Sequence, residues 1–199
     1  MDLSPVAAHD AASVTDEERE AAVLVPVIER ADEAHLLFIR RSDDLSDHAG
    51  QMSFPGGGRE PGDDDLLATA LRESREEVDM DTGRVDVVGR LDDIRTVTRY
   101  SVRPFVARVP DQDWTPDPNE VAEIAPLPLS GLTDLDNYQS ERRDHPHYGD
   151  IRLHYVHVDG YTVWGATGRI LVQFLELATD WEVPDEVDRV ADPDADFLS

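Results

Sequence analysis

Apolar residues in this chain fall into short runs separated by polar segments rich in glycine and proline, which is the pattern of a sheet joined by loops. Residues 21–29 and 35–41 each contain an aliphatic run and predict two largely buried strands. Pro26 indicates that part of the first strand lies at a sheet edge, because proline cannot donate a ladder hydrogen bond. Further strands are predicted at residues 85–91, 102–109, 121–127 and 152–158.

Two segments have helical periodicity instead. Apolar residues recur at three- and four-residue spacing within residues 64–79 and again within residues 165–179. Residues 42–63 predict a long loop, residues 128–135 a turn or short helix, and residues 136–150, rich in Asp, Arg and His, another loop. Several strands combined with two helices predict an α/β sandwich.

The first predicted helix carries a row of carboxylates. Glu73, Glu76 and Glu77 are spaced i, i+3 and i+4, so they project from one helix face and repel one another. A divalent cation that prefers oxygen ligands would offset this repulsion, and Mg²⁺ fits best where a phosphate completes its shell. Arg72, at the edge of this face, is placed to pair with a carboxylate or to hold the preceding loop.

The segment before this helix, residues 54–63, contains four glycines and two prolines and predicts irregular structure. Its glycines allow the backbone to approach a ligand closely. Asp63 to Asp65 predict the N-cap and first turn of the helix. A Glu- and Arg-rich run can also be a simple solvated helix face, but the glycine loop at a fixed distance before it favours a functional site.

These residues together resemble the Nudix box, Gly-x5-Glu-x7-Arg-Glu-U-x-Glu-Glu-x-Gly-U, in which U is apolar. The chain matches it at Gly58, Arg72, Glu73, Glu76, Glu77 and Met80. Three positions differ: Asp64 replaces the first Glu, Ser74 replaces an apolar residue and Asp79 replaces the last Gly. The last change is tolerable, since Asp can adopt the left-handed conformation at a helix C-terminus.

The resemblance implies a Nudix-type α/β/α sandwich with a mixed sheet, and metal-dependent hydrolysis of a nucleoside diphosphate linked to another group. It implies that Glu73, Glu76 and Glu77 hold Mg²⁺ or Mn²⁺ and that Arg72 orients them. Asp64 is then expected to pair with an Arg rather than with the metal. Glu120 is the first candidate for the general base, although a surface carboxylate is the simpler reading of that residue.

A second motif resembles the signature of the coenzyme A diphosphatase branch of the family, His-x-Gly-Gln-x-x-Phe-Pro-Gly-Gly after a Leu-Leu-x-x-x-Arg-Ser strand end. The matching residues are His48, Gly50, Gln51, Phe54, Pro55, Gly56 and Gly57. An Arg that many members carry just before the His is absent here. Residues 161–171 also resemble a later segment of that branch. The resemblance implies cleavage of coenzyme A to 3′,5′-ADP and 4′-phosphopantetheine.

The same resemblance implies a set of substrate contacts. They are Arg40, His48, Gln51, Phe54, Gly56, Gly57 and Gly58. Each has a simpler reading as well: Phe54 as a core aromatic residue, His48 as a hydrogen-bonding loop residue, and Arg40 with its neighbour Arg41 as surface charges at a strand end. As a cluster around a glycine loop they are typical of a diphosphate site, because guanidinium groups pair with phosphate oxygens.

Composition limits the partners. The chain has 199 residues, no cysteine and a formal net charge of −26, with 18 basic residues, all arginine, against 44 acidic ones. Such charge disfavours nucleic acid as a partner and resembles cytosolic proteins of salt-accumulating halophiles. No apolar run is long enough to span a membrane, and a cytoplasmic location is expected. Residues 1–20 and 184–199 are expected to be loose acidic tails around a single domain at residues 21–183, monomeric or homodimeric.

Two other functions remain open on the sequence. One is hydrolysis of ADP-ribose or another nucleoside diphosphate rather than coenzyme A. The other, from a different class, is nucleotide binding without turnover, as in a regulator; the intact set of Glu73, Glu76 and Glu77 argues against it. An isopentenyl diphosphate isomerase of the same fold would need a catalytic cysteine, which this chain lacks.

Overall fold

The computed structural model describes residues 1–44, 48–96, 98–145 and 149–191. The helical elements in chain order are α1 (Ser4–Ala7), α2 (Leu66–Val78), η1 (Thr82–Arg84), α3 (Leu129–Thr133), η2 (Leu135–Asn137) and α4 (Gly165–Ala178). The strands are β1 (Arg19–Glu29), β2 (Ala34–Arg41), β3 (Met52–Ser53), β4 (Gly56–Gly58), β5 (Asp86–Arg90), β6 (Ile94–Arg95), β7 (Tyr100–Val109), β8 (Val121–Pro128), β9 (Tyr138–His145), β10 (Gly149–Val158), β11 (Tyr161–Val163) and β12 (Arg189–Val190).

The strands form two sheets. The first has the order β3–β2–β1–β7–β5, with β4 paired to β1, β6 to β7 and β8 to β2, and the second has the order β11–β10–β9–β12. In the first sheet β1 and β7 run parallel, whereas β1 pairs antiparallel with β2 and β4. The predicted fold class, α/β with a mixed sheet, is therefore confirmed.

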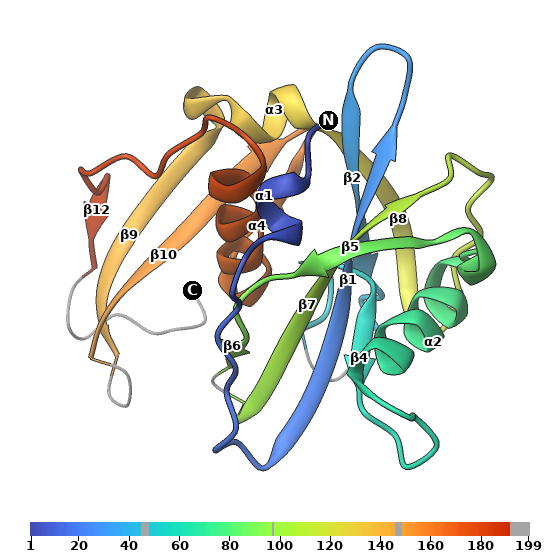
Figure 1. The fold of residues 1–199 in the computed structure, drawn as a ribbon. Helices are drawn as coiled ribbons and strands as arrows, with labels where there is room; N and C mark the ends of the chain where they lie inside the picture. The colour runs from blue at the N-terminus through green and yellow to red at the C-terminus, as the bar shows by residue number, and fades with distance from the viewer. Residues whose placement is uncertain (45–47, 97, 146–148, 192–199) are drawn as a thin grey trace.

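Strand β1 explains how the layers are built. Val23, Val25 and Val27 belong to the core that β1 shares with α4 and the second sheet. The intervening Leu24 and Ile28 belong to the core that contains the end of α2. Because successive side chains of a strand point to opposite faces, a continuous apolar run is what a strand covered on both faces requires. Figure 1 shows α2 on one side of the first sheet and α4 on the other, between the two sheets.

The sequence predicted a sheet edge at Pro26, and this prediction is wrong. Pro26 lies in the interior of the sheet, in register with Ala107 of the parallel neighbour β7. On its other side β1 pairs with β4 through residues 21–23 and with β2 through residues 27–29. Pro26 falls in the interval between these two pairings, so its missing N–H is tolerated there.

The segment expected to be a loop at residues 136–150 is instead a hairpin of long strands. Residues of β9 pair antiparallel with β10 from Tyr138 to His145, and residues 146–148 lie outside the described part. The prediction was wrong because the charged side chains that suggested a loop belong to a sheet that is only partly covered. Glu141, for example, is buried in this sheet while Arg142, next to it, is exposed.

The N-terminal residues also differ from the expected loose tail. Leu3 and Val6 are each 1% exposed and join the main core. His9 Nε2 lies 2.8 Å from an Asp92 oxygen, and the same carboxylate accepts a hydrogen bond from the Ala12 N–H. The segment was misjudged because it contributes few apolar residues and its partners are about eighty positions away in the chain.

The C-terminal segment is attached as well, as far as the structure describes it. Strand β12 pairs parallel with β9, and the Asp188 carboxylate accepts a hydrogen bond from the Ser140 N–H at 2.7 Å. Residues 192–199, the rest of the predicted tail, lie outside the described residues. Within the described part, no helix is both long and apolar enough to cross a membrane.

One half-buried histidine gives the fold a pH dependence. His154 on β10 has its Nδ1 2.7 Å from the Tyr138 hydroxyl, and burial lowers its pKa from 6.5 to about 4. The unfolded chain therefore binds the proton more readily, so the stabilising contribution is complete above pH 6.5 and is lost as the pH falls towards 4.

We expect the wild type to lose about 2 kcal/mol more unfolding free energy between pH 7 and pH 5 than the variant His154→Gln. Urea titrations in molar KCl at the two pH values measure the difference. His157→Gln is the matched control, because His157 lies on the same strand and is exposed. Equal losses in wild type and His154→Gln would show that His154 is protonated without cost.

Candidate active site

Helix α2 (Leu66–Val78) lies within the predicted range 64–79, with a cap at each end. The Asp65 side chain caps its N-terminus by accepting a hydrogen bond from the Ala68 N–H at 2.8 Å. Asp79 closes the C-terminus in the left-handed conformation, with φ of 53°, and its N–H reaches the Arg75 and Ser74 carbonyls. Ser74 is fully buried and donates its hydroxyl to the Ala70 carbonyl at 2.7 Å, so a polar residue is accommodated in an apolar position.

Arg72 holds one end of the carboxylate face. Its Nη1 donates to a Glu73 oxygen at 2.9 Å and to a Glu76 oxygen at 3.0 Å. Its Nη2 donates to the Gly58 carbonyl at 3.1 Å. One guanidinium therefore fixes two carboxylates of the helix relative to the glycine strand.

The carboxylate that anchors Arg72 is Asp63 and not Asp64. Asp63 accepts from Arg72 Nε at 2.9 Å and from Nη2 at 3.1 Å, and also from the Glu60 N–H and the Thr69 hydroxyl. The Arg72 guanidinium holds the pKa of Asp63 well below its usual range. The prediction for Asp64 was wrong by one residue. It rested on the spacing of the motif, whereas the conformation of the preceding loop decides which Asp side chain meets Arg72.

The glycines before α2 form a strand rather than an irregular loop. Gly56, Gly57 and Gly58 pair with Val23, Ala22 and Ala21 of β1. A Cβ at Gly56 would lie 2.3 Å from the Ala22 carbonyl oxygen, and a Cβ at Gly57 would lie 2.6 Å from the Glu73 carboxylate. Glycine is therefore required here for close approach of backbone and carboxylate, in a regular strand that the prediction did not anticipate.

Glu77 is the most buried member of the carboxylate face. Its residue exposure is 2%, and one oxygen accepts a hydrogen bond from the Gly56 N–H at 2.9 Å. Burial raises its pKa to about 8, helped by the charges of Glu73 and Glu120 and opposed by the Gly56 N–H and the charge of Arg41. A carboxylate held in this way needs a nearby positive charge to stay ionised.

Glu73 and Glu120 contribute to the same electrostatic field. Burial raises the pKa of Glu73; Arg72 opposes the shift, and the charges of Glu76 and Glu120 add to it. Glu120 itself is exposed, and its carbonyl accepts a hydrogen bond from the Ser42 N–H at 2.8 Å. The structure therefore brings Glu120 close enough to influence Glu73 and Glu77, from the loop that leads into β8.

Comparison with known proteins identifies this arrangement. The NUDIX domain profile matches residues 18–148, more than half of the chain. The chain belongs to the Nudix family. It is a hydrolase acting on pyrophosphate bonds, and Nudix hydrolases generally use divalent metal ions such as Mg²⁺.

The relatives of this Nudix hydrolase extend over most of its length. A protein of Photorhabdus laumondii named "Uncharacterized Nudix hydrolase NudL" is 36% identical over 167 residues, covering 82% of this chain and 87% of its own. A NudL of Salmonella paratyphi B is 36% identical over 173 residues, covering 85% of each. The solved NUDIX domain of Shewanella oneidensis NrtR, complexed with ADP ribose, is 16% identical with a TM-score of 0.48, covering 65% of this chain and 84% of that one.

The predicted substrate contacts before the Nudix helix differ in their exposure. Phe54 is 1% exposed and stacks on Phe38 at 4.5 Å between ring centroids, so it is a core residue with no surface for a substrate; that predicted contact was wrong. His48 and Gln51 lie together, with His48 Nδ1 3.1 Å from Gln51 Oε1. Both stay candidates for substrate contact.

Arg41, rather than the predicted contact Arg40, lies near the carboxylate face. Arg40 pairs with the Asp43 carboxylate at 3.2 Å and lies 3.7 Å from a Glu123 oxygen, so it is not directed at the Glu73–Glu77 face. The charge of Arg41 acts on Glu77, and its Nε is buried without a hydrogen-bond partner among the described residues. Sequence reasoning missed Arg41 as a site residue, although the Arg-Ser pair at the end of β2 was the available signal.

The carboxylates fit a divalent cation through their chemistry. Among the described residues, no group of three or more acidic or His side chains is already arranged to hold a metal ion, since Glu73 and Glu76 turn to Arg72 and Glu77 to Gly56. The donor set is nonetheless oxygen-only, on one helix face, and it includes the buried Glu77. Hard divalent cations such as Mg²⁺ and Mn²⁺ favour such ligands.

Proposed function

We propose that this Nudix hydrolase cleaves the diphosphate of coenzyme A, giving 3′,5′-ADP and 4′-phosphopantetheine, with Mg²⁺ or Mn²⁺ held by Glu73, Glu76 and Glu77. The reaction type is supported by how the carboxylates are held. Glu77 accepts a hydrogen bond from the Gly56 N–H, and Arg72 holds Glu73 and Glu76. Coenzyme A as substrate rests on the resemblance of residues 48–57 to the coenzyme A diphosphatase signature.

The chemistry assigned to each residue follows from its contacts. Water adds to one phosphorus, the bridging P–O bond breaks, and the leaving phosphate carries away the bridging oxygen. When bound, the cation neutralises the diphosphate and lowers the pKa of a bound water. Arg72 keeps Glu73 and Glu76 in place through hydrogen bonds, and Gly57 leaves the space that the Glu73 carboxylate occupies. These contacts restrict where the two carboxylates lie before substrate binds.

Arg41 and Glu120 are assigned to the substrate phosphate and to the attacking water. Arg41 has a buried Nε near Glu77 that finds no hydrogen-bond partner among the described residues, which suits a phosphate oxygen of the substrate. Glu120 lies within the field of Glu73 and Glu77 and is exposed, so it is the group we assign to accept the proton of the attacking water.

A substrate panel tests the function. The purified protein, in molar KCl with Mg²⁺ or Mn²⁺, is given coenzyme A, ADP-ribose, NADH and diadenosine polyphosphates, and kcat/KM is compared. We expect coenzyme A to have the highest value, with 3′,5′-ADP and 4′-phosphopantetheine identified by mass spectrometry. A clear preference for ADP-ribose would replace our assignment of the substrate, and no turnover of any of them would favour a binding role.

A further inference from the structure

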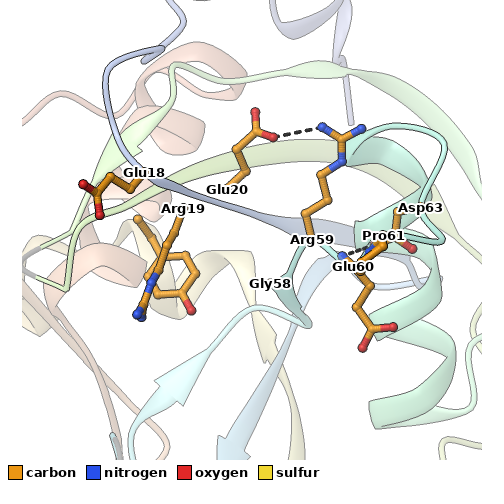
Figure 2. Close-up of a pocket in the computed structure, with 9 residues that line it drawn as sticks. Glu18, Arg19, Glu20, Gly58, Arg59, Glu60, Pro61 and Asp63 are labelled. Carbon is orange, nitrogen blue, oxygen red and sulfur yellow. Dashed lines mark hydrogen bonds and ion pairs between the residues drawn. The ribbon is translucent and has the colours of Figure 1, made fainter.

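A hollow lies beside the carboxylate face, on the other side of Arg72. Its volume is about 460 Å³, and it is bounded by the start of β1, the β4–α2 connection and the start of β7. Figure 2 shows Arg59 and Glu20 directed at each other across it, with Arg19 on the opposite side and Glu60 below. The volume is within the range of small-ligand sites.

An aromatic and guanidinium platform forms one wall of this hollow. The Arg19 guanidinium carbon lies 5.5 Å from the centroid of the Tyr100 ring, in cation–π geometry. Gly58 lines the hollow without a side chain and lies next to Tyr100. A Cβ at this position would be 4.0 Å from a carbon of the Tyr100 ring. Within the described residues, Arg19 has no carboxylate at ion-pair distance. The face of the guanidinium turned away from Tyr100 is therefore available for stacking.

The hollow and the carboxylate face share their central residues. Arg72 Nη2 contacts the Gly58 carbonyl and Asp63, both of which line the hollow, while Nη1 contacts Glu73 and Glu76. A substrate whose diphosphate lies at the carboxylates can extend past Arg72 and place its end here. The hollow and the carboxylates of α2 could therefore bind two parts of one substrate molecule.

The charges of the hollow select a neutral base over a phosphate. Four carboxylates line it, Glu18, Glu20, Glu60 and Asp63, against the two guanidinium groups of Arg19 and Arg59. Arg59 is occupied by Glu20 at 2.9 Å. A phosphate would meet net negative charge, whereas a base with an exocyclic amine donates to carboxylates and stacks on planar side chains.

We propose that this hollow is the adenine subsite of the nucleoside diphosphate substrate, with the base stacking on Arg19, which Tyr100 supports from the other side, and the exocyclic amine donating to a carboxylate of the rim. The assignment rests on the proposed function, in that the adenine belongs to the molecule whose diphosphate is cleaved. It adds two residues outside the Nudix box to substrate recognition, both at the beginnings of neighbouring parallel strands.

Binding of free adenosine tests the subsite without turnover. Saturation-transfer NMR titrations use the metal-free protein in molar KCl with adenosine and with inosine, which lacks the amine. We expect the Kd for adenosine to rise about tenfold in Arg19→Gln and in Tyr100→Ala, because stacking on a base contributes this much. Arg30→Gln is the matched control, since Arg30 pairs with Asp111 away from the hollow. Circular dichroism checks the fold of each variant.

The outcomes separate the subsite from the proposed function. Unchanged adenosine binding in Arg19→Gln, or inosine bound as tightly as adenosine, would overturn the subsite whatever the enzyme hydrolyses. Steady-state kinetics supply the second readout: in Arg19→Gln we expect KM for coenzyme A to rise about tenfold with kcat changed less than about twofold. If coenzyme A is not hydrolysed by the wild type, the proposed substrate fails while the adenosine titration still decides the subsite.

Discussion

Glu77→Gln is expected to lower kcat for a nucleoside diphosphate substrate by at least about a thousandfold, since loss of a metal ligand removes several kcal/mol of transition-state stabilisation. The amide keeps the shape of the side chain but removes its charge, so it cannot hold a cation as the carboxylate does. The fold should remain, because a buried group whose pKa is raised to about 8 is destabilising when ionised and the neutral amide lacks that penalty.

Thermal unfolding gives the second readout for Glu77. We expect Mg²⁺ to raise the Tm of the wild type and to leave that of Glu77→Gln unchanged, because a ligand that binds only the folded state stabilises it. Glu182→Gln, at an exposed position away from α2, should behave as the wild type in both measurements. Retention of more than about a tenth of the wild-type activity by Glu77→Gln would contradict the assignment of the metal face.

Gly57→Ala is expected to reduce kcat by about a hundredfold with little change in Tm. The new Cβ would lie 2.6 Å from the Glu73 carboxylate, which must then move away from Arg72 Nη1. A displacement of about 1 Å at a catalytic group can cost a hundredfold in rate. Stability should change little, since the group that moves is the end of a flexible side chain.

The matched control for this change is Gly62→Ala. Gly62 lies in the same connection before α2, and a Cβ there would meet no atom within 4 Å. Steady-state kinetics and thermal unfolding on both variants separate displacement of Glu73 from a general effect of alanine on the segment. Full activity in Gly57→Ala would mean that the position of Glu73 does not limit the reaction.

The helix and the chemistry on it were predictable because both depend on local sequence. Spacing alone places Glu73, Glu76 and Glu77 on one face. The Asp65 side chain and the Asp79 backbone N–H cap the helix by binding groups only a few residues away. The buried run of β1 was also readable, since a strand covered on both faces is continuously apolar. These are the features in which neighbours in sequence are neighbours in space.

The features that were missed depend on distant partners. Whether Asp63 or Asp64 meets Arg72 is decided by how the loop before α2 turns. Arg41 rather than Arg40 faces Glu77 because it follows Leu37 and Ile39, whose side chains pack in the core that contains the end of α2. Which face of β2 lies against α2 is set by the packing of distant elements, so the sequence of the strand alone does not show which arginine meets Glu77.

The packed N-terminal segment extends the folded unit beyond the region that the family profile matches. The family profile begins at residue 18, yet Leu3 and Val6 lie in the main core, and Gly89 has no side chain where a Cβ would lie 2.8 Å from the Val6 carbonyl oxygen. A recombinant fragment trimmed to the profile would leave an apolar furrow open along β5 and α4. The unit that folds is therefore larger than the unit that homology recognises, and residues before the motif take part in it.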